Sequence, residues 1–586
     1  MLGKILKIED KLIKVENLKK ISLIDIIGFY VIFESKKQLV GEVEFVNELE
    51  FHIRLIGEIR NKTFIPGTEN YPSIDSKCRV VYKEELEYII GSQDIFLPEN
   101  LLLGKSTIYD GFNISVKIND LFASHMAIVG NTGAGKSCCV ARMIQNLFAE
   151  NKPNPKSAQI IMFDAYGEYI SALTKINEHQ NINVKILSQN LYESGNVERI
   201  KIPPYLLDAD DLAILLNVED STLVPVLEKT LTYVYIFKSS ESICNEYKND
   251  IIAKALYDIL SSGRSAQQIR DQALAFLAKY NTSELNLETI VVQPGYNRTI
   301  KQCLNIDNQG KLQALEVLME HLKHYSELSI DQIETKPTVY TLDDIYYALE
   351  FAIVSEGAIL SDAIFEKMNR LKTSLHSIIN SELKTIFDYK GNFDRNGYVK
   401  NLFLTPTNEF VQFIDVDFNG IDDRFAKIII KILSKIFYKF STSLPERGSF
   451  PINILVEEAH RYIQNDNDVN VIGYNVFDRI AKEGRKYGLI LGLITQRLSE
   501  LSSNTLSQCS NFIVFRMFYP DDIKVITSIS SNISMDHVEK VKSLRPGSAL
   551  LFGNAFKIPL ITQFDIPDPM PKSTSVNIVK RWYEVE

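Results

Sequence analysis

At 586 residues, with 45% hydrophobic and 24% charged side chains, the chain has an ordinary globular composition and is long enough for roughly three or four domains. Its net charge of −10 excludes a wholly basic nucleic-acid coating protein, although a ring-shaped motor needs positive charge only along its pore. The six cysteines form no CxxC pair, the start of the chain is charged, and no apolar run approaches the roughly 18 residues of a membrane helix. We therefore expect a cytoplasmic protein without a membrane anchor.

Short strand-like runs separated by polar turns fill the first 95 residues. They are 21–33, 40–46, 51–59 and 78–82. Period-two alternation over residues 41–45 and the turn at Pro66-Gly67 predict a small β-barrel or sandwich. This domain either stabilises the rest of the chain as a cap or carries a ligand site of its own.

From about residue 96 the pattern changes to strand–loop–helix units, which are typical of an α/β nucleotide-binding core. The sequence GNTGAGKS follows a strand-like run at 126–129 and precedes apolar positions at helical spacing, and it matches GxxxxGK[ST]. Backbone N–H groups of such a loop surround a phosphate, and the next helix points its positive end at the same anion. We expect Lys136 to reach the β- and γ-phosphates of ATP and the Ser137 hydroxyl to hold Mg²⁺. The residues expected to bind the nucleotide are Gly130, Asn131, Thr132, Gly133, Ala134, Gly135, Lys136, Ser137 and Cys138.

The next apolar run, 160–163, is suited to a central parallel strand. It delivers Asp164 at its carboxyl end, which is where ligands lie in such sheets.

Residues from about 203 to 395 have a helical pattern and carry no catalytic or metal-binding constellation. The predicted helical segments are 209–216, 221–237, 250–260, 266–279, 312–324, 343–351 and 364–380. This region is expected to be an insertion that either covers the core or meets a neighbouring subunit, and the sequence does not distinguish the two.

Adjacent acids follow the mostly apolar run 452–456. Because successive residues at a strand end face different directions, the two carboxylates can serve two tasks. We expect Glu457 to lie near the Mg²⁺ shell and Glu458 to act as general base on the attacking water. The alternative is a solvated acidic pair at the start of a helix, where the dipole favours it.

The strand-like run 489–494 ends in Thr495-Gln496-Arg497. In ATPases with a strand between the phosphate-loop strand and the acidic strand, a polar residue here faces the γ-phosphate. Gln496 is therefore the expected sensor of the γ-phosphate and attacking water, with a strand-end cap as the alternative.

Basic residues cluster just before that run, at 479–486. An arginine supplied by a second subunit stabilises the charge of phosphoryl transfer and contributes on the order of 10³–10⁵ in rate. Arg485 is the first candidate because a glycine precedes it and a strand follows, although a solvated basic helix end remains the alternative. Arg516, within the predicted strand 511–517, is the second candidate.

Taken together, these segments resemble the HerA family of hexameric DNA translocases, relatives of FtsK in the RecA-like ASCE class. The matching segments are 125–137 (HMAIVGNTGAGKS), 164–169 (DAYGEY), 455–460 (LVEEAH), 483–488 (EGRKYG), 495–500 (TQRLSE) and 544–547 (LRPG). The resemblance is clear over residues 100–200 and 400–567, weak over 1–30, and least over the helical region 203–395.

The resemblance implies a homohexamer with ATP between subunits that threads double-stranded DNA through its pore. Lys136 and Ser137 would bind phosphate and Mg²⁺, Glu458 would be the catalytic acid, and Asp164 would help to hold the metal or water. Gln496 would sense the γ-phosphate, and Arg485 would reach in from the next subunit. Family members work with a nuclease in DNA-end resection, or with a nuclease or sirtuin-like NAD-consuming effector in anti-phage systems.

The fold expected is α/β, with a RecA-like P-loop core, an N-terminal β-barrel and a helical insertion. The expected domains are 1–95 (barrel), 96–202 (first part of the core), 203–395 (insertion), 396–567 (second part of the core) and 568–586 (tail). The function expected is ATP-driven translocation on duplex DNA with an effector encoded elsewhere. One alternative is a nucleotide-stabilised ring scaffold that activates a toxic effector, and a protein-unfolding ATPase is a third reading with less support.

Overall fold

The structure is a computed structural model that forms two compact units. The sheet unit comprises residues 1–200, 398–465 and 475–586, and the helical unit comprises 201–397 and 466–474. The structure describes residues 2–9, 12–17, 26–34, 37–67, 69–91, 94–150, 152–179, 182–190, 197–239, 242–293, 295–326, 328, 338–357, 362–529, 533, 535–572 and 578–583. Within these residues, every helix is too short or too polar to span a lipid bilayer.

The first sheet is an antiparallel barrel-like sheet. Its strands run in the order β1-β2-β5-β4-β3-β7, and β6 pairs with β5. Their bounds are β1 (Ile5–Glu9), β2 (Leu12–Glu16), β3 (Tyr30–Glu34), β4 (Gln38–Val46), β5 (Glu50–Arg60), β6 (Thr63–Pro66) and β7 (Lys77–Val80). The Leu2 N–H donates to the Cys78 carbonyl (2.8 Å) and so joins the two ends of the sheet around an apolar core. The predicted run 21–33 is shorter as a strand: residues 21–25 lie outside the described residues, and β3 starts only at Tyr30.

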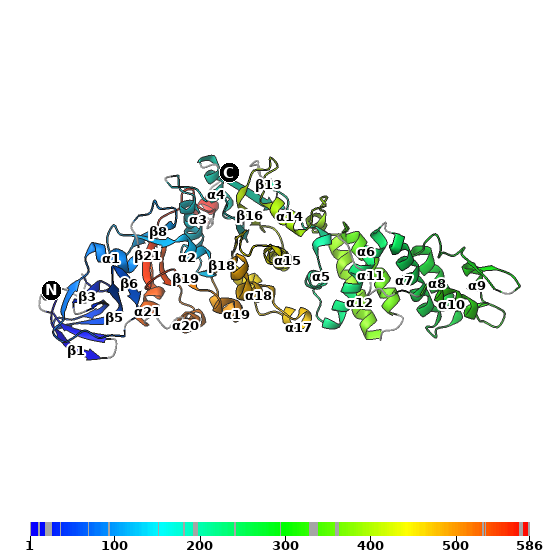
Figure 1. Cartoon of the computed structure of the whole chain (residues 1–586), viewed down its shortest axis with the longest axis horizontal. Helices are drawn as coiled ribbons and strands as arrows, with labels where there is room; N and C mark the ends of the chain where they lie inside the picture. The colour runs from blue at the N-terminus through cyan, green and yellow to red at the C-terminus, as the bar shows by residue number, and fades with distance from the viewer. Residues whose placement is uncertain are drawn as a thin grey trace. The chain divides into compact units, whose positions relative to one another are not determined.

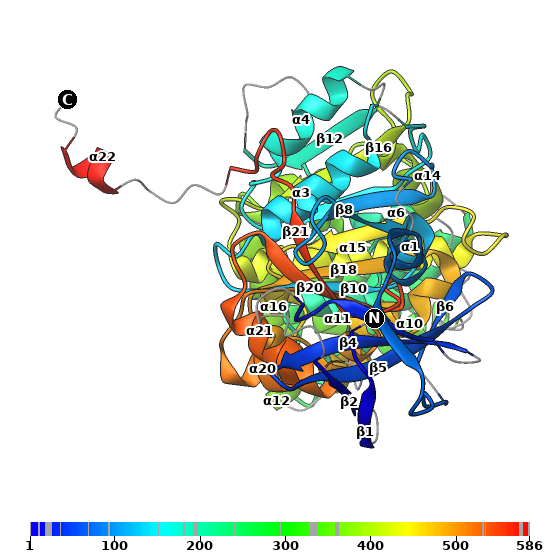
Figure 2. The same ribbon diagram turned by 90° about the vertical axis from the view of Figure 1, so that its left-hand side faces the viewer.

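The second sheet forms the centre of the same unit. Its order is β13-β12-β16-β11-β17-β18-β10-β19-β20-β21-β8-β9, and β20, β10 and β18 are labelled across it in Figure 2. The bounds are β8 (Asn100–Ser106), β9 (Asn113–Lys117), β10 (Met126–Val129), β11 (Ile160–Asp164), β12 (Asn183–Ser188), β13 (Val197–Glu198), β16 (Val411–Asp417), β17 (Ile452–Val456), β18 (Leu489–Thr495), β19 (Asn511–Phe515), β20 (Ser548–Gly553) and β21 (Leu560–Phe564). From β13 to β19 every pairing is parallel, and beyond β19 every pairing is antiparallel.

The central parallel strands β10, β11, β17 and β18 are mostly apolar, as is typical where both faces of a sheet are covered. All five residues of β11 are buried. Helix α3 (Lys136–Leu147) packs on one face through buried Val140, Met143, Ile144 and Leu147, which are the positions predicted from helical spacing. The expected α/β fold with an N-terminal barrel is therefore confirmed.

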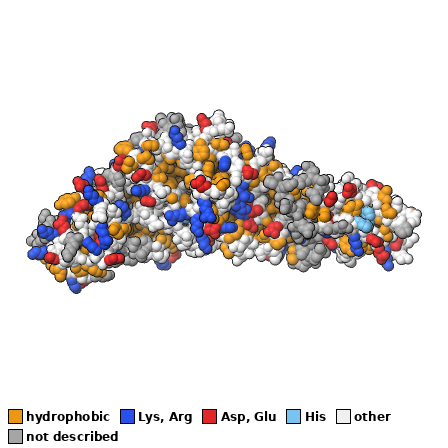
Figure 3. Space-filling view, viewed as in Figure 1, with side chains coloured by type: hydrophobic (Ala, Val, Ile, Leu, Met, Phe, Trp, Pro, Cys, Tyr) orange, Lys and Arg blue, Asp and Glu red, His pale blue; other side chains and the backbone are white. Residues whose placement is uncertain are grey.

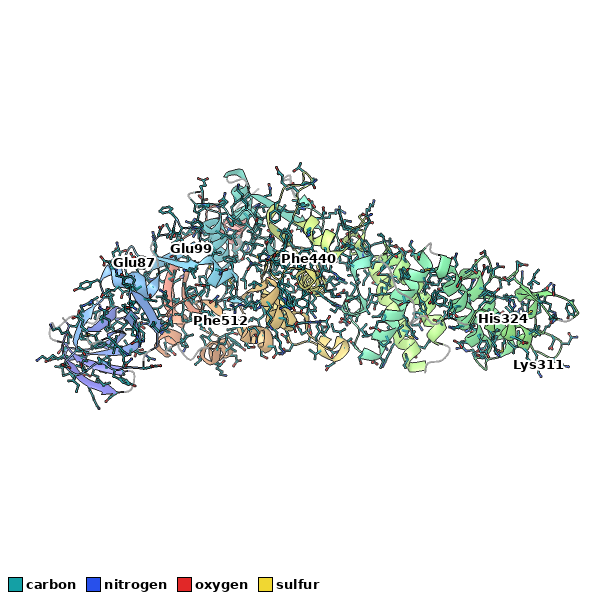
Figure 4. All side chains as sticks on the ribbon, viewed as in Figure 1. Glu87, Glu99, Lys311, His324, Phe440 and Phe512 are labelled. Carbon is teal, nitrogen blue, oxygen red and sulfur yellow. The ribbon has the colours of Figure 1, made fainter. Side chains whose placement is uncertain are left out.

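The remaining helices of the sheet unit cover its strands or connect them. They are α1 (Lys83–Ile90), α2 (Ile118–Phe122), α4 (Ile170–His179), α15 (Asp423–Ser443), α16 (Ala459–Tyr462), α18 (Val476–Glu483), α19 (Ser503–Ser507), α20 (Pro520–Ile529), α21 (Met535–Ser543) and α22 (Ile578–Tyr583), with the short helices η4 (Gly484–Tyr487) and η5 (Leu498–Glu500). Aromatic rings pack between these layers. Figure 4 labels Phe512, whose ring stacks on Phe552 at 5.0 Å, and Phe440, which meets Phe450 edge-on at 5.4 Å.

The helical unit is built from packed helices, as its sequence pattern predicts. They are η1 (Pro204–Leu206), α5 (Ala209–Leu215), η2 (Ser221–Leu223), α6 (Val224–Lys238), α7 (Ser242–Leu260), α8 (Ala266–Lys279), α9 (Ile300–Cys303), α10 (Leu315–Lys323), α11 (Leu342–Gly357), α12 (Asp362–Ile379), α13 (Lys384–Phe387) and α17 (Asp468–Ile472), and α14 (Arg395–Leu402) crosses between the units. A two-stranded sheet, β14 (Ile290–Val291) and β15 (Arg298–Thr299), accompanies them. Helix α11 packs on α6, α7 and α12, and α7 packs on α8 and α10 (Figure 1). On the face drawn in Figure 3, acidic and basic side chains are interspersed.

Removing a large side chain from the core of the central sheet is predicted to lower the free energy of unfolding substantially. Phe163 is fully buried in β11, and its ring meets Phe418 at 6.0 Å. We expect Phe163→Ala to destabilise the sheet unit by about 3–5 kcal/mol, because the lost contacts leave a cavity. The control is Phe518→Ala, since Phe518 is 61% exposed. Urea unfolding monitored by circular dichroism gives the unfolding midpoint of each variant. Equal midpoints for the two variants would contradict the packing described.

Candidate nucleotide-binding site

The loop between β10 and α3 turns through glycines in the left-handed region. Gly133 has φ 71°, and Gly135, the N-cap of α3, has φ 114°. A Cβ on Gly135 would lie 3.0 Å from the backbone of Gly547, so the loop also needs glycine for close approach. The first turn of α3 leaves its N–H groups without helical partners, directed toward the same space as the loop. This is the arrangement that binds a phosphate.

Neighbouring segments hold the loop in this shape. The Gly547 N–H donates to the Ala134 carbonyl (2.9 Å), and the Asn131 N–H donates to the Arg516 carbonyl (3.0 Å). The Gly130 N–H donates to the Thr495 carbonyl at 3.3 Å. The LRPG segment therefore has a physical role in supporting the phosphate loop.

Lys136 extends along the loop, where its Nζ donates to the carbonyls of Gly130 (2.8 Å) and Asn131 (3.2 Å). Burial lowers the pKa of this ammonium, and the carboxylates of Glu458 and Glu457 oppose that shift. A phosphate would add negative charge beside it and favour the charged form further.

Strand order brings the acid pair to the same edge. β18 lies between β10 and β17, with Val129 in register with Thr495 and Leu493 in register with Val456. Since all three strands are parallel, their carboxyl ends carry the phosphate loop, Gln496 and Glu457-Glu458 side by side.

Glu457 is 5% exposed, and its Oε2 has no hydrogen-bond partner among the described residues. Burial raises its pKa well above the usual value, and the neighbouring Asp164, Glu168 and Glu458 add to the shift. A buried carboxylate oxygen crowded by other acids is suited to a cation.

Glu458 has a backbone conformation that non-glycine residues seldom adopt, with φ 47° and ψ 42°. This turn directs it toward Gln496, whose Nε2 lies 3.3 Å from both of its carboxylate oxygens. The Oε1 of Gln496 accepts a hydrogen bond from Thr132 Oγ1 (2.6 Å), and His460 Nδ1 lies 3.3 Å from Glu458 Oε2. A chain of polar contacts thus joins the phosphate loop, the sensor position and the expected general base.

Asp164 does not line the cavity. Its Oδ1 accepts the N–H groups of Tyr166 (3.1 Å) and Gly167 (2.9 Å), and its Oδ2 accepts that of Tyr169 (2.9 Å). The side chain is fully buried behind Glu457 and shapes the loop that follows β11. The structure therefore places this predicted metal ligand one layer away from the open site.

That loop presents Glu168 and Tyr166, to which the sequence analysis assigned no role. Burial raises the pKa of Glu168, the charge of Asp164 adds to the shift, and a hydrogen bond with Ser137 opposes it. The sequence offered a sign of this role, because Glu168 is the fifth residue of the DAYGEY segment and lies next to the phosphate loop.

These residues enclose a cavity of about 410 Å³. It is lined by Thr132, Gly133, Gly135, Lys136, Ser137, Cys138, Tyr166, Glu168, Glu457, Glu458, Ile494 and Gln496. Among these lining residues Lys136 is the one basic side chain, and it faces three carboxylates. Gly130, Asn131 and Ala134 do not line it but carry the backbone bonds that shape the loop.

The lining fits Mg²⁺ by its donor chemistry. Mg²⁺ prefers hard oxygen ligands, including carboxylates, and is usually shared with substrate phosphates. Ser137 and the unpartnered Oε2 of Glu457 provide such oxygens, and Glu168 lies beside them.

Another cavity of about 990 Å³ lies in the same unit, lined by residues of α19, α20 and the turn between β20 and β21. Its lining is apolar and hydroxyl-rich and contains none of the residues of the phosphate loop. The smaller cavity is the candidate site because of its chemistry.

The two arginine candidates lie in different places. Arg485 is exposed on η4, before the amino end of β18, whereas Gln496 follows its carboxyl end. Seven strand residues separate those ends by roughly 20 Å, so Arg485 does not reach the cavity of its own chain. Arg516 lies one residue past the end of β19, not within the strand as predicted, and its Nε is buried.

The contact between Thr132 and Gln496 predicts a catalytic effect. Thr132→Val removes the hydroxyl that holds Gln496, which should lower kcat for ATP about tenfold while KM changes little. Thr132→Ser keeps the hydroxyl and is the control. Steady-state hydrolysis assays measure both, and a Val variant with the wild-type kcat would contradict this role of the hydroxyl.

Comparisons with known proteins show which proteins this chain is similar to. A family model described as the central domain of helicase HerA matches residues 101–311. The chain is 24% identical over 558 residues to the probable DNA double-strand break repair helicase HerA of Methanocaldococcus jannaschii, with 93% of this chain and 90% of that protein covered. It is 22% identical over 530 residues to the DNA double-strand break repair helicase HerA of Pyrococcus furiosus, with 90% and 79% covered. A solved structure of VirB4 of Thermoanaerobacter pseudethanolicus matches with a TM-score of 0.45 and 14% identity, covering 79% of this chain and 96% of that one.

The family match extends further than the resemblance predicted. It continues from the phosphate loop to residue 311, well into the region 203–395 that was expected to be the least similar. With an intact phosphate loop and acid pair at one sheet edge, the chain is an ATP-hydrolysing enzyme that is similar to HerA helicases over most of its length and matches the HerA central-domain model over residues 101–311.

Proposed function

We propose that this chain is the ATPase subunit of a homohexameric ring that moves along double-stranded DNA. The observation that carries the proposal is the cavity with one lysine and three carboxylates, which is short of positive charge for a triphosphate. Two additional cations would complete it: Mg²⁺ and an arginine from a neighbouring subunit. The relatives named as DNA double-strand break repair helicases support DNA as the track.

Within each pocket the residues have separate tasks. The N–H groups of the loop and Lys136 bind the phosphates. Ser137 and Glu457 would hold Mg²⁺, which would supply further positive charge beside the phosphates. Glu458 accepts a proton from the attacking water, and Gln496 orients that water toward the γ-phosphate. Asp164 supports this edge from behind through its bonds to the following loop.

Arg485 is the proposed cation from the neighbouring subunit. Its exposure on η4 and its distance from its own cavity both suit a residue that acts on another protomer's nucleotide. It lies near His125, whose pKa burial lowers to about 4, with a contribution from the charge of Arg485. Arg485 therefore lies at the edge of the sheet opposite the phosphate loop.

We further propose that the motor serves a separate effector, either a nuclease or a sirtuin-like NAD-consuming enzyme, in DNA processing or anti-phage defence. Among the described residues, no group of three or more His, Cys, Asp or Glu side chains is placed to hold a metal ion as a metal-dependent nuclease centre would. The family resemblance supports this division of labour. The alternative is a ring scaffold that assembles such an effector and does not move on DNA.

Loss of the phosphate-binding lysine tests the motor. Lys136→Ala should abolish ATP hydrolysis and displacement of a triplex-forming strand from duplex DNA, because both need the bound triphosphate. Lys486→Ala, at an exposed lysine on η4, is the control. Wild-type protein that hydrolyses ATP but displaces no triplex would favour the scaffold, and undiminished hydrolysis by Lys136→Ala would refute the site itself.

Arg485→Ala should bind ATP with nearly the wild-type affinity yet hydrolyse it on the order of 10³-fold more slowly. Binding is measured with a fluorescent ATP analogue, and hydrolysis in the presence of duplex DNA. Because Lys486 is the next residue on the same short helix, Lys486→Ala controls for loss of local charge. If Arg485→Ala retains full turnover, the role passes to Arg516 or to no arginine at all.

A further inference from the structure

The helical unit contains a cavity of about 370 Å³ between the end of α7 and helices α8, α11 and α12. This volume lies within the range of small-molecule sites, roughly 300–1,000 Å³. All of its lining residues lie between 259 and 372, so this cavity shares no residue with the phosphate loop.

Positive charge predominates around this cavity. Its lining includes three basic side chains, Arg264, Lys279 and Lys372, and one carboxylate, Glu350. Lys372 Nζ lies 2.7 Å from Glu350 Oε1, and Lys279 pairs with the other oxygen of the same carboxylate. Burial raises the pKa of Glu350, but the hydrogen bonds from the two lysines outweigh it and leave the pKa lowered. The ionised carboxylate fixes both ammonium groups at the cavity, and the lining keeps a net charge of +2 in a chain whose total is −10.

Aromatic and aliphatic side chains also line this cavity. Phe276 lies on α8 and Tyr280 is the C-cap of that helix, with ring centroids 5.3 Å apart, and the ring of Phe351 meets Tyr280 at 5.1 Å. At the rim, Phe365 is 40% exposed and Val354 is 37% exposed. Apolar side chains left exposed beside fixed cations are typical of a binding surface.

We propose that this cavity binds a small organic anion with a flat aromatic body, such as an aromatic carboxylate, sulfonate or phosphate ester. The aromatic body would lie against Phe276 and Phe365, and the acidic group would meet Arg264 and the two lysines. Apolar walls strengthen the attraction between these cations and an anion, because they exclude water from the contact. A neutral molecule of the same shape would gain only the apolar contacts.

Calorimetry on the full-length protein tests the proposal with naphthalene sulfonate and its neutral isostere, naphthalene sulfonamide. We expect one sulfonate site per chain and binding of the sulfonamide that is roughly tenfold weaker or more. Arg264→Gln and Phe365→Ala change exposed rim residues and should each weaken the sulfonate several-fold. Arg270→Gln, on α8 but outside the cavity lining, should leave the affinity unchanged.

A second variant tests whether the charges at the cavity, and not only its shape, determine the preference for the anion. Replacing Lys279, Glu350 and Lys372 together by Met removes the ion cluster at similar volume, a kind of change that folded proteins often tolerate. Because this variant keeps Arg264, its preference for the sulfonate over the sulfonamide should become several-fold smaller than in the wild-type protein without disappearing. Equal affinities in the wild-type protein, no binding of the sulfonate, or wild-type binding by Arg264→Gln would each overturn the proposal.

Discussion

The position of β18 between β10 and β17 is the constraint on which the rest of the site depends. Parallel pairing in this order places the carboxyl ends of three strands together, and each end carries one part of the chemistry. The phosphate loop follows β10, Gln496 follows β18, and the acid pair follows β17. The hydrogen bonds from Thr132 to Gln496 and from Gln496 to Glu458 then connect the three parts across the edge. A sheet with a different strand order could contain every one of these motifs. It would nevertheless separate the groups that must act on one phosphate.

Charge is the reason for the proposal that a single protomer does not complete the site. Lys136 faces Glu168, Glu457 and Glu458 across the cavity, so an added triphosphate would bring further negative charge to an already acidic lining. The buried Oε2 of Glu457, which has no hydrogen-bond partner within the described part of the chain, is suited to a metal cation. The exposed Arg485 lies near the amino end of β18, away from this cavity, and is the arginine that we propose acts on another protomer. The proposed ring follows from this shortage of positive charge.

Short-range pattern was enough to predict much of this protein. The phosphate loop, the acid pair and Gln496 were found because each depends on a strand end and a few residues around it, and α8 follows its predicted bounds because its apolar spacing is regular. The position of Asp164 could not be predicted from sequence. A carboxylate at a strand end can bind a metal or accept hydrogen bonds from the N–H groups that follow it, and the conformation of the loop after β11 decides between the two. The role of Glu168 depends on the same turn. The proposed anion cavity of the helical unit could not be predicted, because Arg264, Glu350 and Lys372 lie far apart in the chain. The helix packing that brings them together has no local sequence pattern.

Mixing two inactive variants tests most directly whether two protomers build each pocket. The Lys136→Ala chain keeps Arg485 but has lost its phosphate lysine, and the Arg485→Ala chain has the opposite defect. In an equal mixture of co-assembled rings, about a quarter of the interfaces would combine an intact cradle with an intact arginine. The account predicts that the mixture regains ATP hydrolysis to a substantial fraction of the wild-type rate, whereas each variant alone has almost none. A mixture as inactive as its components, despite shared rings, would contradict it.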